Sequence, residues 1–231
     1  MNDFSQFEKA IGVSFRDKSL LKTAFTNRSY LNENRNARIE HNERLEFLGD
    51  AVLELAVTEY LFEKYPAKPE GELTSFRSAL VNAATLSKIA AGLSMNDFLL
   101  LSRGEARDTG RARQIILANA IEALIGAIFL DQGYVGAKDF IARNILPLTD
   151  EIVSNRAWLD PKSHFQERAQ EVFGVTPSYE TLSETGPDHD KHFLVGVFIG
   201  REKVAVGDGK SKQEAEQNAA DKGLAAKGWL R

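Results

Sequence analysis

The sequence predicts an all-α domain followed by a small α+β domain with the element order α-β-β-β-α. From about residue 4 to 153, apolar residues recur at three- and four-residue spacing, which is the period of a helix. After residue 160 the pattern changes to alternating or β-branched runs between two helical segments. A chain of 231 residues also exceeds a typical single domain. We therefore expect two domains.

Turn residues divide the first domain into separate helices. The clearest are the proline-containing turn at 65–69 and four glycines, Gly92, Gly104, Gly110 and Gly133. The run 115–130, IILANAIEALIGAIFL, is apolar except for Asn119 and Glu122. It is too short and too interrupted for a convincing membrane span, and an almost uniformly apolar helix is a buried one. We expect a core helix and no membrane partner.

The second domain begins with a helix that starts near Asp160 or Ser163 and stops at Gly174. Three strands follow, PSYETLSE, HFLVGVFIG and EKVAVGDG, joined by GPDHDK and by Gly200-Arg201. The last helix opens with the S-x-x-E capping box of Ser211 and Glu214. The predicted boundaries are 1–153 for the first domain, 154–160 for a linker and 161–231 for the second domain.

Composition restricts the cell compartment and the class of partner. The chain has no cysteine, which excludes disulfides and thiolate metal sites and suits a reducing cytoplasm. The net charge of −4 argues weakly against nucleic-acid binding. Locally, however, segment 103–113 carries Arg103, Arg107, Arg111 and Arg113 against Glu105 and Asp108. This segment is either a solvated surface loop or a phosphate-binding loop.

Three carboxylates line one face of the predicted helix that contains HNERLEFLGD, residues 41–50. Glu43, Glu46 and Asp50 stand at i, i+3 and i+7, where like charges cost stability. Glu54 extends the same stripe. One interpretation is the wet face of an amphipathic helix, and the other is a site that needs negative charge.

The buried run 115–130 favours the second interpretation. Asn119 and Glu122 share one face of that helix, and a carboxylate inside a domain needs a partner. The partner is either a basic side chain or a divalent cation shared with the acidic stripe. Oxygen ligands favour Mg²⁺ or Mn²⁺ over zinc. Gly49 and Gly126 would let the two helices approach closely.

These motifs resemble those of the ribonuclease III family. NERLEFLGD at 42–50 is similar to the family signature. Three further blocks keep the family's order and spacing: TNRSYLNE at 26–33, GELTSFRSALV at 71–81 and ANAIEALIGAIFLD at 118–131. The second domain resembles the double-stranded-RNA-binding domain through DPKSHFQE at 160–167, GPDHDKHF at 186–193 and GDGKSKQEAEQNAA at 207–220. The resemblance covers nearly the whole chain.

The resemblance implies a homodimeric endoribonuclease that cleaves double-stranded RNA with Mg²⁺, for which Mn²⁺ can substitute. Products would carry 5′-phosphate and 3′-hydroxyl ends with short 3′ overhangs. Position by position, it implies metal ligation by Glu46, Asp50, Asn119 and Glu122, and catalytic roles for Asp50, Glu122, Glu43 and Glu70. Phe47 matches the aromatic residue that enters the partner subunit. Asn119 stands where many members have aspartate, so its amide brings no charge.

The resemblance also assigns an RNA-binding surface, which agrees with recognition of A-form RNA by its shape and phosphates. Its predicted members are Ser163, Gln166, Glu167, Gln170, Pro187, Asp188, His189, Lys210, Ser211 and Lys212, together with Arg107 and Arg111 of the basic segment. Lys210 and Lys212 stand at a helix N-terminus, which favours phosphate.

The expected role is processing of ribosomal RNA precursors and other structured transcripts, including messenger and transfer RNA, in the cytoplasm. The alternative is a double-stranded-RNA-binding regulator that does not cleave, in which Asn119 marks a decayed metal site. An all-α scaffold with merely superficial acids is a third interpretation, which leaves the position of Glu122 unexplained. Cleavage of duplex RNA with Mg²⁺ but not with EDTA or Ca²⁺ would separate them.

Overall fold

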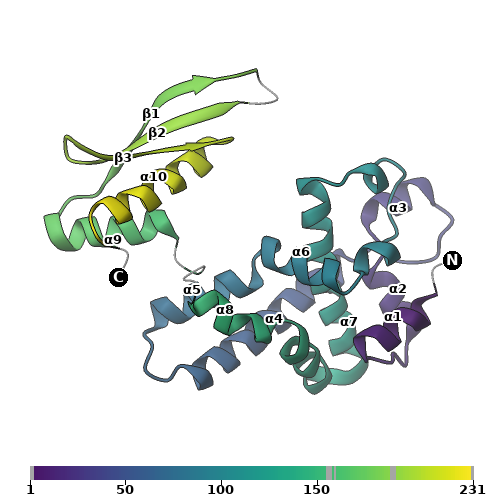
Figure 1. Ribbon diagram of the computed structural model, residues 1–231. Coiled ribbons are helices and arrows are strands. Elements are labelled where there is room, and N and C mark those ends of the chain that lie inside the picture. Colours follow the sequence, from purple (N-terminus) through teal and green to yellow (C-terminus); the bar gives the residue numbers. More distant parts are fainter. Residues whose placement is uncertain (1–2, 155–157, 159, 188–190, 230–231) are drawn as a thin grey trace. The chain divides into compact units, whose positions relative to one another are not determined.

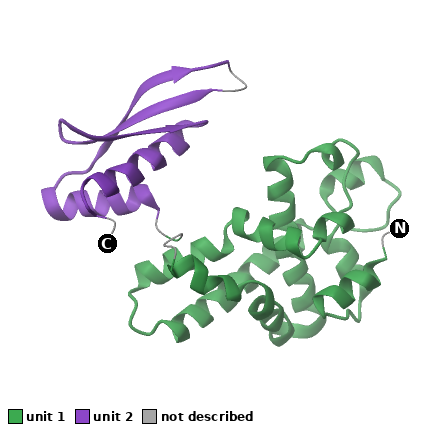
Figure 2. Ribbon diagram, in the orientation of Figure 1, with its two compact units in different colours: residues 1–158 green, residues 159–231 purple. Residues whose placement is uncertain are grey.

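The computed structural model describes residues 3–154, 158, 160–187 and 191–229. The chain forms two compact units, Met1–Trp158 and Leu159–Arg231 (Figure 2). Unit 1 is helical and unit 2 contains a sheet with two helices (Figure 1). The predicted all-α plus α-β-β-β-α organisation is confirmed.

Unit 1 contains eight α-helices and three short 3-10 helices in its described residues. They are α1 (Phe4–Ile11), α2 (Lys18–Ala24), α3 (Arg28–Glu33), α4 (Glu43–Lys64), α5 (Glu70–Val81), α6 (Ala83–Gly92), η1 (Met95–Phe98), η2 (Glu105–Arg107), α7 (Arg111–Asn144), η3 (Leu146–Leu148) and α8 (Thr149–Ser154). The glycines expected to punctuate the chain do so. Gly92 ends α6, Gly110 precedes α7, and Gly133 interrupts α7 with a φ of 76°.

The core of unit 1 is built around α4 and α7, which make its most extensive helix contact. The middle of α7 is buried on nearly every side, as expected from its apolar run. By length and composition the stretch from Arg111 would suffice to cross a membrane, but 61% of its apolar window is buried within the protein. Burial of this kind is typical of the core helix of a soluble protein.

The start of α4 is fixed by hydrogen bonds to the segment between α2 and α3. The Asn42 amide donates to the Thr26 carbonyl at 2.9 Å, and Thr26 forms a parallel bridge with Leu100. Asn27, to which the sequence assigned no role, caps α3 by accepting a hydrogen bond from the Ser29 amide at 2.8 Å. These contacts hold the N-termini of α3 and α4 side by side.

Unit 2 consists of a three-stranded antiparallel sheet with two helices packed on one face (Figure 1). The strands are β1 (Ser178–Thr185), β2 (His192–Ile199) and β3 (Glu202–Gly209), in the order β1-β2-β3. The helices are α9 (Pro161–Phe173) and α10 (Lys212–Ala226). Alternate residues of β2, such as Val195 and Val197, are fully buried, because successive strand side chains point to opposite faces.

Both helices of unit 2 begin, and α9 ends, where the sequence predicts. The Asp160 carboxylate accepts from the Ser163 amide at 3.0 Å, and Gly174 closes α9 with a φ of 66°. Ser211 Oγ accepts from the Glu214 amide at 3.2 Å, but the Glu214 carboxylate accepts from the Lys210 amide rather than from that of Ser211. The capping box is therefore shifted by one residue on its second half.

The segment predicted as a linker, 154–160, has described residues that belong to the flanking units. Ser154 ends α8, and the Trp158 ring packs edge-on against Phe76 of unit 1 with centroids 4.8 Å apart. Asp160 caps α9. Trp158 therefore ties the end of unit 1 to its own core.

Candidate active site and nucleic-acid interface

Helices α4 and α7 cross with their backbones in direct contact, and two glycines make this possible. A Cβ atom added to Gly49 would lie 1.7 Å from the Glu122 carbonyl oxygen, and one added to Gly126 would lie 2.2 Å from the Leu45 carbonyl oxygen. A side chain at either position would overlap the partner backbone. The close approach expected from these glycines is confirmed.

The crossing brings together the acidic stripe of α4 and the polar pair of α7. Glu46 is half-buried, and its pKa is raised by burial and by the negative charge of Glu43, and lowered by a hydrogen bond from the Asn119 side chain. Burial, together with the negative charges of Asp50 and Glu46, raises the pKa of Glu122 to about 7. The four predicted metal-binding residues therefore share one region.

The donor set fits a hard divalent cation. Within the described part of the chain, neither Glu46, Asp50 nor Glu122 forms an ion pair with a basic side chain, so their negative charge has no partner. The side chains are not gathered tightly as they stand. No three histidine, cysteine, aspartate or glutamate groups among the described residues are arranged to hold an ion. Charge and ligand type thus favour a cation, whereas the present side-chain positions do not enclose one.

The two remaining predicted acids lie at helix starts. Glu43 begins α4, half-exposed, with Arg28 Nη1 at 3.7 Å from one carboxylate oxygen and His41 Nδ1 at 3.7 Å from the other. Glu70 begins α5 and is exposed, and its carboxylate accepts from the Thr74 hydroxyl at 3.1 Å. The sequence interpretation missed Arg28 and His41. Their only signal was their position beside the motifs TNRSY and HNERL.

Phe47 lies one residue after Glu46 and is 81% exposed, which is unusual for a phenylalanine. It lines a cavity of about 800 Å³ together with Leu20, Leu48 and Leu130. Leu55 and Phe62 continue an exposed apolar stripe along the same face of α4. An apolar stripe of this kind is typical of a protein interface.

The basic segment presents some of its arginines and uses another internally. Arg107, in η2, and Arg111, at the start of α7, are exposed, as phosphate contacts require. Arg113 instead donates to three groups of unit 1. Arg113 is therefore not one of the exposed cations of the segment, with which the sequence had grouped it.

The predicted minor-groove side of α9 is exposed. Its four residues are Ser163, Gln166, Glu167 and Gln170. The Ser163 hydroxyl donates to the Asp160 carboxylate at 2.7 Å, which leaves its oxygen free to accept. Pro187 is also exposed, whereas Asp188 and His189 lie outside the described residues.

The start of α10 carries Lys210, Ser211 and Lys212, all exposed. Most other lysines of unit 2 pair with its own acids. These pairs are Lys162–Glu216, Lys191–Glu184, Lys222–Asp208 and Lys227–Glu202, at 2.6–3.0 Å. Lys212 forms no ion pair with any described residue. Lys212 therefore offers its positive charge to phosphate at a helix N-terminus, which itself favours anions.

Comparisons with known proteins agree with this architecture. A ribonuclease-III-like family profile matches residues 17–149, and a double-stranded RNA binding motif matches residues 161–226. Ribonuclease 3 of Anoxybacillus flavithermus is 46% identical over 222 residues, covering 96% of this chain and 93% of the relative. Ribonuclease 3 of Streptococcus pneumoniae is 44% identical over 220 residues, with 92% and 93% covered.

Among solved structures, the nuclease domain of ribonuclease III from Campylobacter jejuni superposes with a TM-score of 0.57 at 43% identity. The match covers 62% of this chain and 96% of that domain, for which flexibility is described in a region involved in dimer formation. The family profiles and the curated relatives agree over both units, and the solved nuclease domain agrees over unit 1. The chain therefore belongs to the ribonuclease III family of endoribonucleases, which act on double-stranded RNA.

Proposed function

We propose that this endoribonuclease works as a Mg²⁺-dependent homodimer. Its products would carry 5′-phosphate and 3′-hydroxyl ends with short 3′ overhangs, and Mn²⁺ would substitute for Mg²⁺. The observation that supports the metal requirement is the set of carboxylates at the α4–α7 crossing, which has no basic partner among the described residues. Uncompensated buried charge is costly, so a cation that arrives from solution would relieve it.

Glu46, Asp50 and Glu122 would hold the cation, with Asn119 assisting through its amide oxygen. A bound divalent ion would lower the pKa of the attacking water and offset charge on the phosphate oxygens. Because the pKa of Glu122 is about 7, a fraction of the protein molecules carries a proton on this carboxyl at neutral pH. Loading the site requires that proton to leave. Glu43 and Glu70, exposed at two helix starts, would position water or substrate.

The test is digestion of a long duplex RNA with Mg²⁺, with Mn²⁺, with Ca²⁺ and with EDTA. We expect short products that carry 5′-phosphates in Mg²⁺ and in Mn²⁺, and no cleavage in Ca²⁺ or in EDTA. Cleavage in EDTA would refute the metal requirement. Products with 5′-hydroxyl ends would refute the proposed direction of attack. Binding without cleavage under every condition would favour the non-cleaving regulator that Asn119 had suggested.

The exposed stripe of Phe47, Leu55 and Phe62 supports a dimer, because a second copy would cover it and because the adjacent cavity could receive an aromatic ring. A two-fold axis would give two sites, one for each RNA strand. Phe47→Asp should shift the protein from dimer to monomer in sedimentation velocity. Val172→Asp is the matched control, since Val172 is a half-exposed apolar residue of unit 2. A dimeric Phe47→Asp variant would contradict this interface.

Unit 2 would supply affinity without base specificity. Exposed polar side chains of α9 suit a minor groove, and Lys210, Ser211 and Lys212 suit phosphates. Recognition by shape fits many structured transcripts, and we propose precursors of ribosomal RNA, with messenger and transfer RNA, as cytoplasmic substrates. Accumulation of extended ribosomal precursors after depletion of the protein would support this role, and unchanged precursor ends would contradict it.

A further inference from the structure

The loop between η1 and α7 is held to α3 by hydrogen bonds. We call residues 102–111 the arginine loop. The Ser29 hydroxyl of α3 donates to the Glu105 carboxylate, and the Ser102 amide donates back to Ser29 Oγ at 3.1 Å. The Arg103 amide donates to both carboxylate oxygens of Glu33 at 3.2 Å. One side of the loop is thereby fastened to α3.

Arg113 fastens the other side. From the first turn of α7, its guanidinium donates to the Glu105 carbonyl at 2.6 Å and to the Asp108 carbonyl at 3.1 Å. A third donor reaches the Asn96 side-chain oxygen at 3.2 Å. A planar guanidinium with five N–H groups can satisfy acceptors in three directions, which a lysine ammonium on a flexible stem cannot do with the same geometry.

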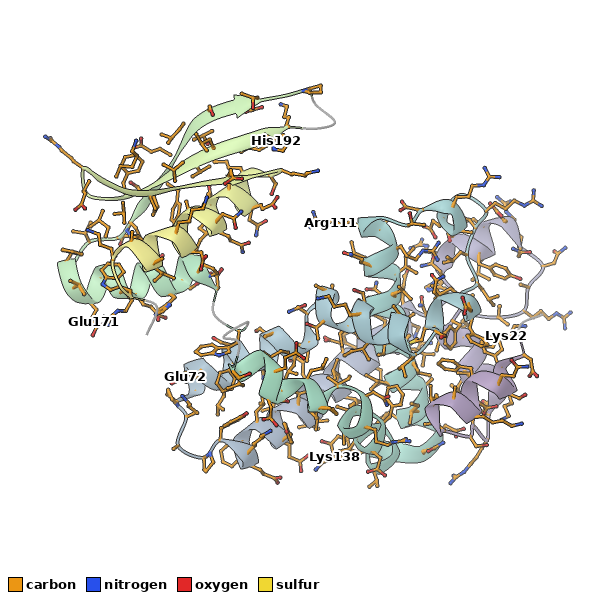
Figure 3. The ribbon with its side chains drawn as sticks, viewed as in Figure 1. Lys22, Glu72, Arg111, Lys138, Glu171 and His192 are labelled. Atoms are coloured by element: carbon orange, nitrogen blue, oxygen red, sulfur yellow. The ribbon has the colours of Figure 1, made fainter. Side chains whose placement is uncertain are left out.

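These contacts leave three arginines facing solvent. Arg103, Arg107 and Arg111 are exposed, and their side chains form no hydrogen bond or ion pair with the residues that the structure describes. Figure 3 shows Arg111 projecting from the start of α7. The two acids of the loop do not compete with them, because Glu105 binds Ser29 and Asp108 accepts from the Gly110 amide at 2.7 Å.

We propose that Arg113 is a positioning residue, whose guanidinium holds the arginine loop in the one shape that presents Arg103, Arg107 and Arg111 to RNA phosphates together. The inference rests on the proposed binding of duplex RNA by these arginines. Arg113 itself touches no phosphate. Its contribution is preorganisation, because a loop that is already ordered loses less conformational entropy on binding.

The salt dependence of binding separates positioning from direct contact. Each phosphate contact adds about 0.9 to the slope of log K against log salt. A residue that contacts one phosphate changes this slope by about 1 when its charge is removed, and lysine retains most of it. Loss of a scaffold instead costs several contacts at once, and lysine does not rescue it.

The experiment measures binding of the full-length protein to a perfect RNA duplex in EDTA over a range of salt. We expect Arg113→Lys and Arg113→Met to lower the slope alike, by about 2 to 3. Ser29→Ala should also lower it, although that change removes no charge, because it releases Glu105 from α3. In the steady state with Mg²⁺, KM should rise while kcat stays unchanged. Hydrogen exchange should show lost protection of amides 103–110.

Arg16→Met is the control, since it removes the same charge from a loop whose backbone binds Asp131. It should leave the slope unchanged. In a background of Arg103→Gln, Arg107→Gln and Arg111→Gln, the change Arg113→Lys should have no further effect, because coupled residues are not additive. Wild-type slope and loop protection in Arg113→Lys, or full additivity, would overturn the inference. Failure of the wild type to bind duplex RNA would instead overturn the proposed function, while hydrogen exchange would still test the loop.

Discussion

At the crossing of α4 and α7, Glu46, Asp50 and Glu122 share one region without a basic partner in the described residues. In unit 2, by contrast, most lysines pair with acids of the same unit. The first arrangement leaves negative charge to be balanced by a cation that arrives from solution. The second neutralises most positive charge and leaves it free at a few positions for phosphate. The difference teaches that unpaired charge, rather than total charge, marks the functional surfaces of this acidic protein.

The largest effect is expected when one negative charge is removed from the crossing of α4 and α7. Asp50→Asn or Glu122→Gln should lower the rate of duplex cleavage by about 10³-fold or more, since several kcal/mol of charge stabilisation are lost. RNA affinity in EDTA should stay nearly unchanged. Glu54→Gln is the matched control, because Glu54 is exposed on the same side of α4. Equal losses of cleavage and binding would refute the assignment.

The close backbone contact can be tested by adding one methyl group. Gly49→Ala should lower the free energy of unfolding by about 3 kcal/mol or more, because the new Cβ would overlap the Glu122 carbonyl. Gly71→Ala is the control, since nothing lies within 4 Å of its Cβ position. Urea unfolding followed by circular dichroism measures both. A Gly49→Ala protein as stable as Gly71→Ala would show that the helices cross further apart.

Asn119 makes the crossing less negative than an aspartate would. Asn119→Asp should strengthen Mn²⁺ binding about tenfold, because ligand charge sets affinity, and should lower thermal stability in EDTA through repulsion from Glu46 and Glu122. Calorimetric titration with Mn²⁺ and a melting curve in EDTA give both quantities. Gln114→Glu adds the same charge to α7 at an exposed position. If both variants behave alike, charge at the crossing has no special effect.

The raised pKa of Glu122 predicts how stability depends on pH. The folded protein holds this proton up to a pKa of about 7, whereas an ordinary carboxyl releases it near 4.5. The folded state therefore binds more protons in this window, so the free energy of unfolding falls as pH rises. In EDTA, melting temperature should fall between about pH 5 and 8, and less steeply in Glu122→Gln. Identical slopes would show that Glu122 is not perturbed.

The smallest effect is expected for a single lysine of unit 2. Lys212→Met should weaken duplex binding a few-fold and reduce the salt slope by about 1. Lys227→Met removes the same charge, but Lys227 already pairs with Glu202 at 2.8 Å and should have less effect. Equal slopes for the two variants would mean that pairing within unit 2 does not decide which lysines bind phosphate.

Local patterns were sufficient for the elements and their ends. Period and turn residues predicted the helices of unit 1 and the α-β-β-β-α order of unit 2, and Asp160, Gly174 and Ser211 marked helix ends correctly. These features depend on backbone and side-chain contacts within a few residues, which the sequence contains directly. The acidic stripe of α4 was likewise predicted, from the i, i+3 and i+7 spacing of Glu43, Glu46 and Asp50.

The pairing of charges could not be read from the sequence, because it depends on residues far apart in the chain. In the sequence, Arg113 is one more cation of the basic segment. In the structure, its guanidinium donates hydrogen bonds to Glu105, Asp108 and Asn96. Glu43 stands between Arg28 and His41, which no local pattern indicated.

By itself, then, the sequence determined the helices, the strands and the residue types available for chemistry. Only tertiary structure decided which charges face one another, because Gly49 and Gly126 must first bring two backbones into contact. Electrostatic energy depends on distance and burial, and both are properties of the folded chain.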